Sequence, residues 1–171
     1  MALKLIWVYA DVHCHLSLLL HLVACLALVL PPARAASVVT RLPGFDGPLP
    51  FYLETGYVGV EEETGTELFY YFVESERSPR TDAVLLWLSG GPRCSVLSGI
   101  AYELGPVMFA VERYNGTLPQ LDYNPYSWTQ MASILFVDSP VGSGFSYAHD
   151  TKGYDVGDMS SSMQMVAFLR K

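Results

Sequence analysis

Three short motifs contain residue types that could take part in covalent or phosphate chemistry. Ser89-Gly90-Gly91 follows an apolar run, and glycines there allow a sharp turn that points a backbone N–H into open space. Such an N–H can donate to the oxyanion that forms during acyl transfer. Because an isolated glycine pair is more often a plain tight turn, the motif predicts an oxyanion-hole donor only if other residues support it.

The other two motifs are rejected on their context. Residues 144–148 (GFSYA) nearly match the nucleophile elbow G-x-S-x-G, which requires a strand, a turn and then a helix. No helical pattern follows, and His149 comes directly after the motif, so we expect Ser146 to be a loop residue. Gly142-Ser143-Gly144 is half of a dinucleotide fingerprint, but Tyr147 stands where the third glycine belongs and no P-loop Lys follows.

Composition excludes several classes of protein. The chain has 171 residues, a formal net charge of -7 and 51% hydrophobic residues, which excludes a disordered tail. An acidic chain lacks the basic face that a nucleic-acid-binding protein needs. Beyond residue 35 the only Cys and His are Cys94 and His149, which excludes a metal site built from clustered Cys and His. We expect no metal and no cofactor.

Residues 1–35 predict a secretory signal peptide. Lys4 precedes the apolar run 16–30, and an Ala-Arg-Ala cleavage site ends at Ala35. The run is shorter than the ~20 residues of a bilayer span, although an uncleaved anchor is an alternative. We expect no stable membrane association after cleavage, and an extracellular or vacuolar protein. In a secreted chain, Asn115-Gly116-Thr117 is an N-glycosylation acceptor.

The order of predicted elements favours an α/β fold. They are an irregular segment (41–51), a hairpin (57–60 and 67–73, with an acidic turn at 61–65), two apolar strands (83–88 and 133–137) and a helix (158–171). Continuous apolar runs such as AVLLWL and SILFV are typical of buried central strands. The helix places Met159, Met163, Val166 and Leu169 on one face. The sequence therefore predicts an α/β sheet that is begun but not completed.

Several longer motifs resemble plant serine carboxypeptidase-like proteins, in the order in which that family has them. They are LPGF (42–45), ETGY (54–57), WLSGGPRCSV from Trp87, ELGP (103–106) and DSPVGSGFSY from Asp138. The resemblance spans residues 41–171. It implies that residues 36–171 form the N-terminal portion of an incomplete α/β-hydrolase domain, with the first strands and helices of its central sheet.

The resemblance also implies roles for individual residues. Gly91 matches the glycine whose N–H forms half of the oxyanion hole. The matches to the positions that hold the terminal carboxylate of a peptide substrate are Trp87, Ser89, Gly90 and Glu103. Cys94 matches a cysteine whose disulfide partner lies further along the family's domain and is absent here. The catalytic Ser, Asp and His likewise belong to motifs beyond Lys171, so none is assigned in this sequence.

Two departures from the family pattern bear on function. The peptidases carry Asn at the position of Ser89, and a hydroxyl offers only one donor where an amide offers two. Ser there, with residues 114–119 (YNGTLP), is similar to the branch of acyltransferases that use acyl-glucose esters. Arg93 replaces a family glycine, and a positive φ there would strain the backbone beside the oxyanion loop.

The sequence thus leaves three functions open. The first is hydrolysis of peptide C-termini through an acyl-enzyme, and the second is acyl transfer from an acyl-glucose ester. The third is a non-catalytic truncated product, in which residues 83–88 and 133–137 are expected to lie uncovered.

Overall fold

The computed structural model describes residues 36–91, 93–111 and 116–171. The predicted signal peptide, residues 1–35, and the predicted glycosylation site, Asn115, lie outside the described residues. The described elements are β1 (Ser37–Val38), β2 (Leu53–Glu61), β3 (Thr66–Val73), β4 (Val84–Trp87), the π-helical η1 (Gly99–Glu103), β5 (Val107–Phe109), β6 (Leu121–Tyr123), the 3-10 helix η2 (Trp128–Gln130), β7 (Ser133–Val137), the 3-10 helix η3 (Thr151–Tyr154) and α2 (Asp158–Leu169).

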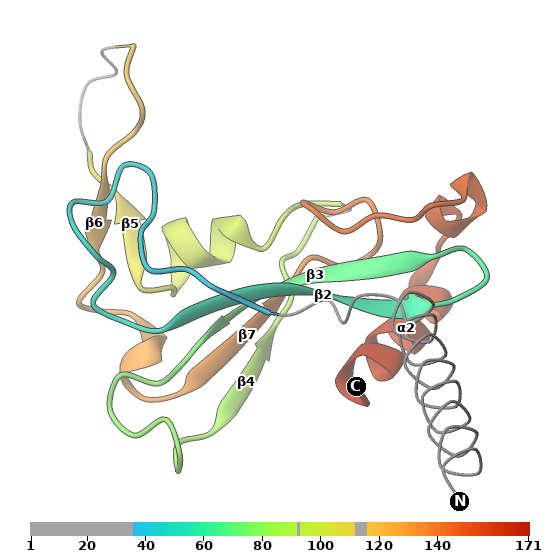
Figure 1. Cartoon of the computed structure of the whole chain (residues 1–171), viewed down its shortest axis with the longest axis horizontal. Coiled ribbons are helices and arrows are strands. Elements are labelled where there is room, and N and C mark those ends of the chain that lie inside the picture. Colours follow the sequence, from blue (N-terminus) through green and yellow to red (C-terminus); the bar gives the residue numbers. More distant parts are fainter. Residues whose placement is uncertain (1–35, 92, 112–115) are drawn as a thin grey trace, which may run out of the picture. The chain divides into compact units, whose positions relative to one another are not determined.

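A five-stranded mixed sheet, in the order β1-β2-β3-β7-β4, organises these elements (Figure 1). β2 and β3 form an antiparallel hairpin, and β3 also pairs antiparallel with β7. β7 pairs with β4 in parallel, so the carboxyl ends of these two strands lie at the same edge of the sheet. The connection between them contains η1, η2 and the separate β5–β6 pair. The predicted α/β class is confirmed.

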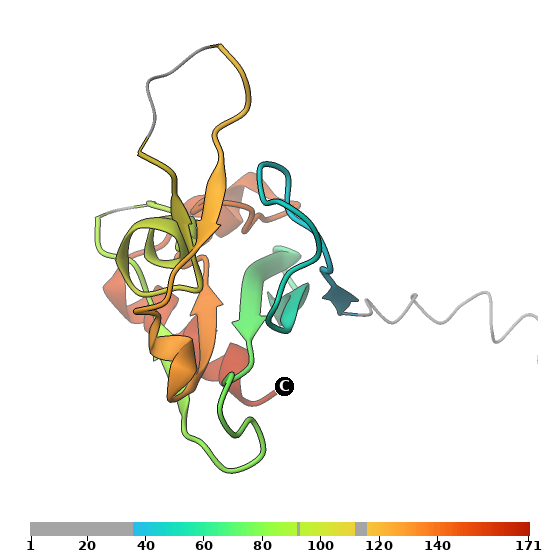
Figure 2. The same cartoon turned by 90° about the vertical axis from the view of Figure 1, so that its left-hand side faces the viewer.

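The predicted hairpin is confirmed, with strands longer than predicted. Its turn residues 61–63 are exposed, as expected for three consecutive glutamates. Residues 41–51 form no extended strand, also as predicted, and Phe45 makes an isolated bridge to Leu121 of β6. Figure 2 shows this blue segment beside the β5–β6 hairpin.

β7 is buried on both faces. Ile134 and Phe136 are fully buried in a cluster with Ile100 of η1, whereas Val137 packs in a second cluster with Phe168 of α2. Because side chains alternate along a strand, the two clusters lie on opposite faces of β7. The continuous apolar run SILFV is explained by this double burial. The expectation that residues 133–137 would lie uncovered is wrong.

β4 differs from its prediction as a central strand. Among the described residues β4 pairs with β7 alone, so it is an edge strand. Its apolar side chains are partly exposed, with Val84 at 62%. A continuous apolar run is typical of a strand that is buried on both faces, but no described element covers β4 in that way. The expectation of an uncovered surface at residues 83–88 is therefore confirmed.

The predicted helix is α2, but its apolar stripe faces outward. The exposed side chains are Met159, Met163, Val166 and Leu169, the residues that the sequence places on one face. Met165 and Phe168 instead pack on Leu68 and Val137, and Gln164 is buried beside them. The stripe identified the helix correctly, but it did not identify the face that packs on the sheet.

This orientation predicts opposite outcomes for two methionines of α2. Met165→Ala is expected to lower the free energy of unfolding by about 2 kcal/mol, because it removes buried contacts with the sheet. Met163→Ala, at an exposed position, is expected to change that free energy by less than about 0.5 kcal/mol. Urea denaturation of both variants checks the orientation, and a larger loss from Met163→Ala would contradict it.

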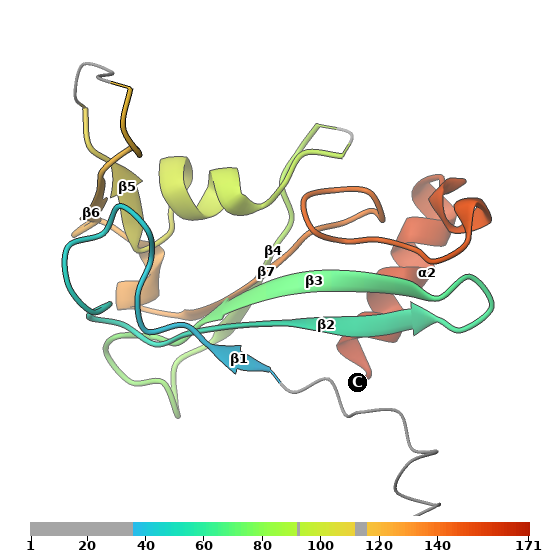
Figure 3. The ribbon, with the colours of Figure 1, turned by 45° about the horizontal axis from the view of Figure 1, so that its top comes forward.

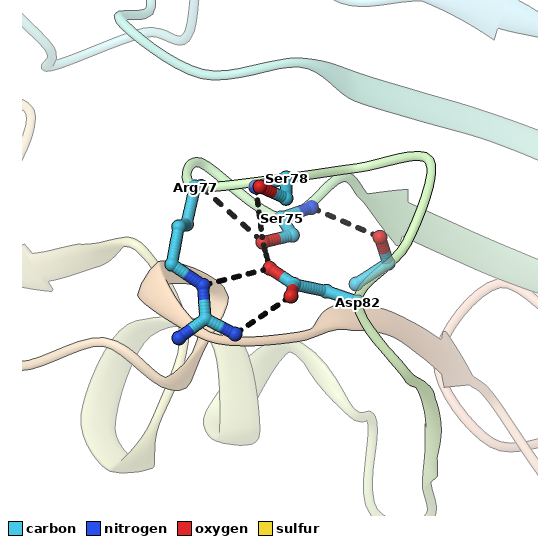
Figure 4. Close-up of polar contacts among 5 residues, drawn as sticks. Ser75, Arg77, Ser78 and Asp82 are labelled. Carbon is cyan, nitrogen blue, oxygen red and sulfur yellow. Dashed lines mark hydrogen bonds and ion pairs between the residues drawn. The ribbon is translucent and has the colours of Figure 1, made fainter.

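A polar turn joins β3 to β4 and fixes where β4 begins (Figure 4). Arg77 donates to both carboxylate oxygens of Asp82, at 2.6 and 3.2 Å, and the Ser75 hydroxyl donates to Asp82 at 2.7 Å. The backbone N–H of Ser75 in turn donates to the hydroxyl of Ser133 at 2.9 Å. The turn is therefore attached to the first residue of β7, the strand that pairs with β4.

The hydrogen bonds from Arg77, and then that from Ser75, lower the pKa of Asp82 below its usual value. A carboxyl group whose pKa is lower in the folded state stabilises the fold above its unfolded pKa of about 3.9. That stabilisation is lost as the pH falls through the folded pKa. We expect Asp82→Asn to destabilise the chain at pH 7 and to have a smaller effect at pH 3, in urea titrations at both pH values. An equal effect at both would contradict the assignment.

Candidate functional site

The candidate site lies where the loops after β4 and β7 meet. Trp87, the last residue of β4, is in register with Phe136 of β7, so the two parallel strands end together. Figure 3 shows the loop after β4 and the orange loop after β7 side by side. The carboxyl edge of parallel strands is where α/β proteins place ligands. Ser89, Gly90 and Gly91 lie in the first of these loops.

Asp138 joins the two loops. Its side chain is fully buried, and one carboxylate oxygen accepts hydrogen bonds from the Ser95 hydroxyl at 2.9 Å and the Val96 N–H at 2.8 Å. The other oxygen accepts from the Phe145 N–H at 3.0 Å. A buried carboxylate requires such donors, and here they come from both loops. This role was not predicted from the sequence, because residue type alone does not reveal partners 42 and 43 positions earlier in the chain.

The charge of Asp138 also acts on a neighbouring phenol. Burial of Tyr71, and then the negative charge of Asp138, raises the pKa of Tyr71 above its usual value. Tyr71 lies on β3, next to β7 in the sheet, and pairs with Phe136. The carboxylate therefore lies between the sheet and both loops.

Gly144 has a packing role in this arrangement. Its φ is +47°, and a Cβ added there would lie 2.0 Å from a carboxylate oxygen of Asp138. Only glycine lets the backbone approach the carboxylate this closely. The Gly142-Ser143-Gly144 motif is therefore explained by loop packing, in agreement with its rejection as a dinucleotide fingerprint.

Ser146 is a structural serine. It is 4% exposed, its hydroxyl donates to the Asp138 carbonyl at 2.5 Å, and it accepts from the Phe69 N–H at 2.8 Å. Ser146 lies in the loop after β7 and is not followed directly by a helix. The prediction of a loop residue is confirmed.

The loop after β4 presents Gly91 in a left-handed conformation. Its φ is +85°, and its carbonyl accepts the Cys94 N–H at 3.2 Å, which closes a turn. Among the described residues, no acceptor is hydrogen-bonded to the Gly91 N–H. Gly90 is exposed, and apart from its two chain neighbours no described residue has an atom within 4 Å of the place where its Cβ would be. The loop can therefore donate an N–H to a bound oxygen with little steric hindrance.

The predicted substrate-binding side chains are only partly brought together. Trp87 is half-buried and contacts Trp128 edge to face, with ring centroids 6.2 Å apart. Its indole nitrogen is buried and has no hydrogen-bond partner among the described residues. Glu103 is exposed at the end of η1, and within the described chain no hydrogen bond joins it to Trp87 or Ser89. The predicted roles of these residues remain predictions.

Ser89 and Cys94, in the loop after β4, have few side-chain partners among the described residues. The Ser89 hydroxyl lies 3.4 Å from the Ser98 hydroxyl, a long distance for a hydrogen bond between hydroxyl groups. Cys94 is exposed and forms no disulfide with any described residue.

The part of the chain that the structure describes contains no group of three or more His, Cys, Asp and Glu placed to hold a metal ion. None of its helices is long and apolar enough to cross a membrane.

Arg93, which stands where the family pattern has glycine, has a left-handed backbone conformation that glycine adopts more easily than other residues. Its φ is +63°, and it is the only non-glycine residue with a positive φ in the described segments. Backbone strain was expected at Arg93 if its φ were positive. Because φ is positive, we expect that strain in this structure. Its guanidinium donates to the carbonyl of Tyr154 at 3.1 Å, a contact that the sequence did not predict.

Comparisons with known proteins agree with this geometry. The family model described as serine carboxypeptidase matches residues 43–171. Serine carboxypeptidase-like 7 of Arabidopsis thaliana is 50% identical over 157 residues, which are 92% of this chain and 36% of the relative. Serine carboxypeptidase-like 16 of the same plant is 52% identical over 139 residues, 81% of this chain and 32% of the relative. The chain thus spans about a third of the length of these curated relatives.

The fold is also similar to that of a solved structure. The crystal structure of Kex1(delta)p, a prohormone-processing carboxypeptidase from Saccharomyces cerevisiae, matches with a TM-score of 0.55 and 24% identity. The match covers 70% of this chain and 27% of the yeast protein. It supports part of an α/β-hydrolase fold. The sheet, the two loops at its carboxyl edge and the match of the family model over residues 43–171 together show that the chain belongs to the serine carboxypeptidase family.

Proposed function

We propose that this chain contributes the oxyanion-side loop of a serine carboxypeptidase-like enzyme. The observation that carries the proposal is the Gly91 N–H, which donates to no acceptor among the described residues, in a loop that the buried Asp138 holds at the carboxyl end of β4. A donor fixed before the reaction stabilises the developing oxyanion without reorganisation. Gly90 leaves space beside this donor for the carbonyl group of a substrate.

The chemistry we propose is hydrolysis of a peptide C-terminus through an acyl-enzyme. A serine hydroxyl attacks the scissile carbonyl, the tetrahedral oxyanion accepts the Gly91 hydrogen bond, and the C-terminal amino acid leaves with a proton. Water then hydrolyses the ester and regenerates the serine. The serine, aspartate and histidine of this reaction would come from the two thirds of the family's domain that this chain does not span.

The exposed edge of β4 supports this division of the domain. Val84, Leu86 and Leu88 are exposed by 62%, 39% and 45%, and β4 has a pairing partner on one side only among the described strands. A cavity of about 220 Å³ lies beyond the carboxyl end of β4, between Leu88, Ser139 and α2. A further strand and its packing helix would cover these surfaces. The remainder of the domain would thereby be placed next to the Ser89–Gly91 loop.

Ser89 favours a second candidate, transfer of an acyl group from an acyl-glucose ester to an alcohol. The Ser98 hydroxyl donates to the Ser95 carbonyl at 3.0 Å, so Ser89 must be the donor in any hydrogen bond with Ser98. Ser89 would then offer a substrate only acceptor lone pairs, which do not suit a carboxylate. A neutral sugar hydroxyl can donate to them.

The remaining family properties are proposals of the same kind. We propose a protein of the secretory pathway, extracellular or vacuolar, with Asn115 glycosylated and Cys94 paired to a cysteine outside this chain. The expected substrates are a peptide C-terminus or an acyl-glucose ester. No nucleic acid and no stable membrane association are expected.

A chimera tests the proposed function. Residues 36–171 replace the matching part of serine carboxypeptidase-like 7, and hydrolysis of blocked dipeptides and transfer from an acyl-glucose ester are measured beside the unaltered relative. The peptidase candidate predicts dipeptide hydrolysis, and the acyltransferase candidate predicts ester transfer. Turnover of neither substrate by a folded chimera, where the unaltered relative turns over one, would overturn both candidates.

Ser89→Asn in the chimera tests which substrate the site prefers. An amide restores donors toward a carboxylate, so we expect the ratio of dipeptide to ester kcat/KM to rise about tenfold, the effect of one hydrogen bond to a charged group. Ser37→Asn, an exposed serine of β1 at the opposite end of the strand order from β4, is the matched control and should leave the ratio unchanged. An unchanged ratio in Ser89→Asn would show that residue 89 does not contact the substrate.

A further inference from the structure

Arg93 stands out as the non-glycine residue that takes a left-handed conformation, two positions after Gly91. Side chains disfavour this conformation, because Cβ comes too close to the backbone. A residue held there needs surroundings that fix it in place. The contacts of its side chain identify those surroundings.

The Arg93 side chain reaches η3. Its guanidinium donates to the carbonyl of Tyr154 at 3.1 Å. Tyr154 in turn contacts the loop after β7, because its hydroxyl accepts the Ala148 N–H at 3.2 Å and its ring lies 3.3 Å from where a Cβ of Gly142 would be. The same Gly142 position lies 3.8 Å from the Arg93 Cδ. Arg93 therefore connects the loop after β4 to η3, with the loop after β7 packed between them.

The tip of the loop after β4 has few other attachments. Asp138 holds its far end, at Ser95 and Val96. Within the described residues of the tip, the only other side-chain hydrogen bond to a residue outside the tip is the long one between Ser89 and Ser98. Ser89 and Arg93 each stand two positions from Gly91, and the Arg93–Tyr154 hydrogen bond is the shorter of these two attachments.

We propose that Arg93 is a positioning residue, which limits the motion of the Gly90–Gly91 turn by tethering it to Tyr154. The role we give to that turn rests on the proposed function, in which Gly91 is the oxyanion donor. The tether itself is a property of this chain and can be measured without a substrate. The tether also gives a role to the arginine that this chain has where the family pattern has glycine.

Two readouts on the full chain test the tether. The first is hydrogen exchange of the Cys94 N–H, because its hydrogen bond to the Gly91 carbonyl closes the turn and is lost when the turn opens. The second is the urea midpoint of global unfolding. In Arg93→Gly, which also relieves the backbone strain, a residue with only a general structural role would move both readouts in the same direction.

Arg93→Gly removes the tether and the backbone strain together. We expect exchange at Cys94 to become about tenfold faster, through more frequent local opening, while the urea midpoint stays unchanged or rises. Arg93→Ala removes the tether but keeps the strain, so exchange becomes faster and the midpoint falls. Arg93→Lys keeps a donor for the Tyr154 carbonyl and should restore exchange to nearly the original rate.

Arg80→Gly is the matched control, because Arg80 is an exposed arginine on a different turn, and it should leave Cys94 exchange unchanged. The proposal is overturned if Arg93→Gly leaves Cys94 exchange unchanged, or if Arg93→Lys exchanges as fast as Arg93→Ala. Because no substrate is involved, these outcomes are separate from those of the chimera. An inactive chimera would overturn the proposed function and leave the tether standing.

Discussion

Asp138→Ala is expected to lower the free energy of unfolding by about 4 kcal/mol, in the range for removing one member of a buried charged network. The substitution leaves the buried N–H of Val96 and the part-buried N–H of Phe145 without their acceptor and opens a void between the two loops. Each buried donor without a partner costs about 1–3 kcal/mol. Urea denaturation of the full chain measures the loss.

Two control substitutions separate the network from the loss of a carboxyl group as such. Asp138→Asn keeps the shape and one acceptor oxygen, so we expect a smaller loss, about 2 kcal/mol. Asp155→Ala, at an exposed position after η3, is expected to change stability by less than about 0.5 kcal/mol. Equal effects of Asp138→Ala and Asp155→Ala would show that Asp138 does not join the loops.

Gly144→Ala is likewise expected to lower the free energy of unfolding by about 4 kcal/mol. Its Cβ would lie 2.0 Å from a carboxylate oxygen of Asp138, which the buried surroundings keep from moving away, and its φ of +47° disfavours a side chain. Gly47→Ala separates these two causes, because Gly47 also has a positive φ but, apart from its chain neighbours, no described residue has an atom within 4 Å of its Cβ position. That control is expected to lose about 1 kcal/mol, the conformational part alone.

The two substitutions should be strongly coupled. Asp138→Ala removes the oxygen atoms with which the new Cβ collides, so adding Gly144→Ala to it should cost only about 1 kcal/mol, the conformational part. The sum of the two single losses would then exceed the loss of the double variant by about 3 kcal/mol, at the upper end for residues in contact. Urea titrations of the four proteins in this cycle measure the coupling. Additive losses would contradict the contact between Gly144 and Asp138.

The secondary structure that could be predicted from sequence is the part determined by local pattern. The β2–β3 hairpin combines β-prone runs with a glutamate-rich turn, and β7 is a short apolar run that ends at Asp138. The short strands β5 and β6 have three residues each, too few for a periodic pattern. The inward face of α2 was not predictable either, because Phe168 and Met165 pack on a sheet formed by distant residues.

The candidate site was predictable to a similar extent. Gly91 became a candidate because the longer motifs around the glycine pair resemble a family that has an oxyanion loop there, and this role stays a prediction. The strain at Arg93 could be established only from its backbone angle. From the sequence it was suggested only by the family glycine at this position. The role of Asp138 and the Arg93–Tyr154 contact depend on pairs 42 or more positions apart, and no local pattern encodes such distances.

The most direct test of the central claim is the kcat of the chimera with serine carboxypeptidase-like 7, compared with that of the unaltered relative on the same substrate. If the loop after β4 supplies the oxyanion donor through Gly91, kcat should stay within about tenfold of the relative's value. Loss of one oxyanion donor lowers kcat by about 10²–10³. A drop of that size, in a folded chimera whose serine still reacts with a phosphonate probe, would contradict the claim.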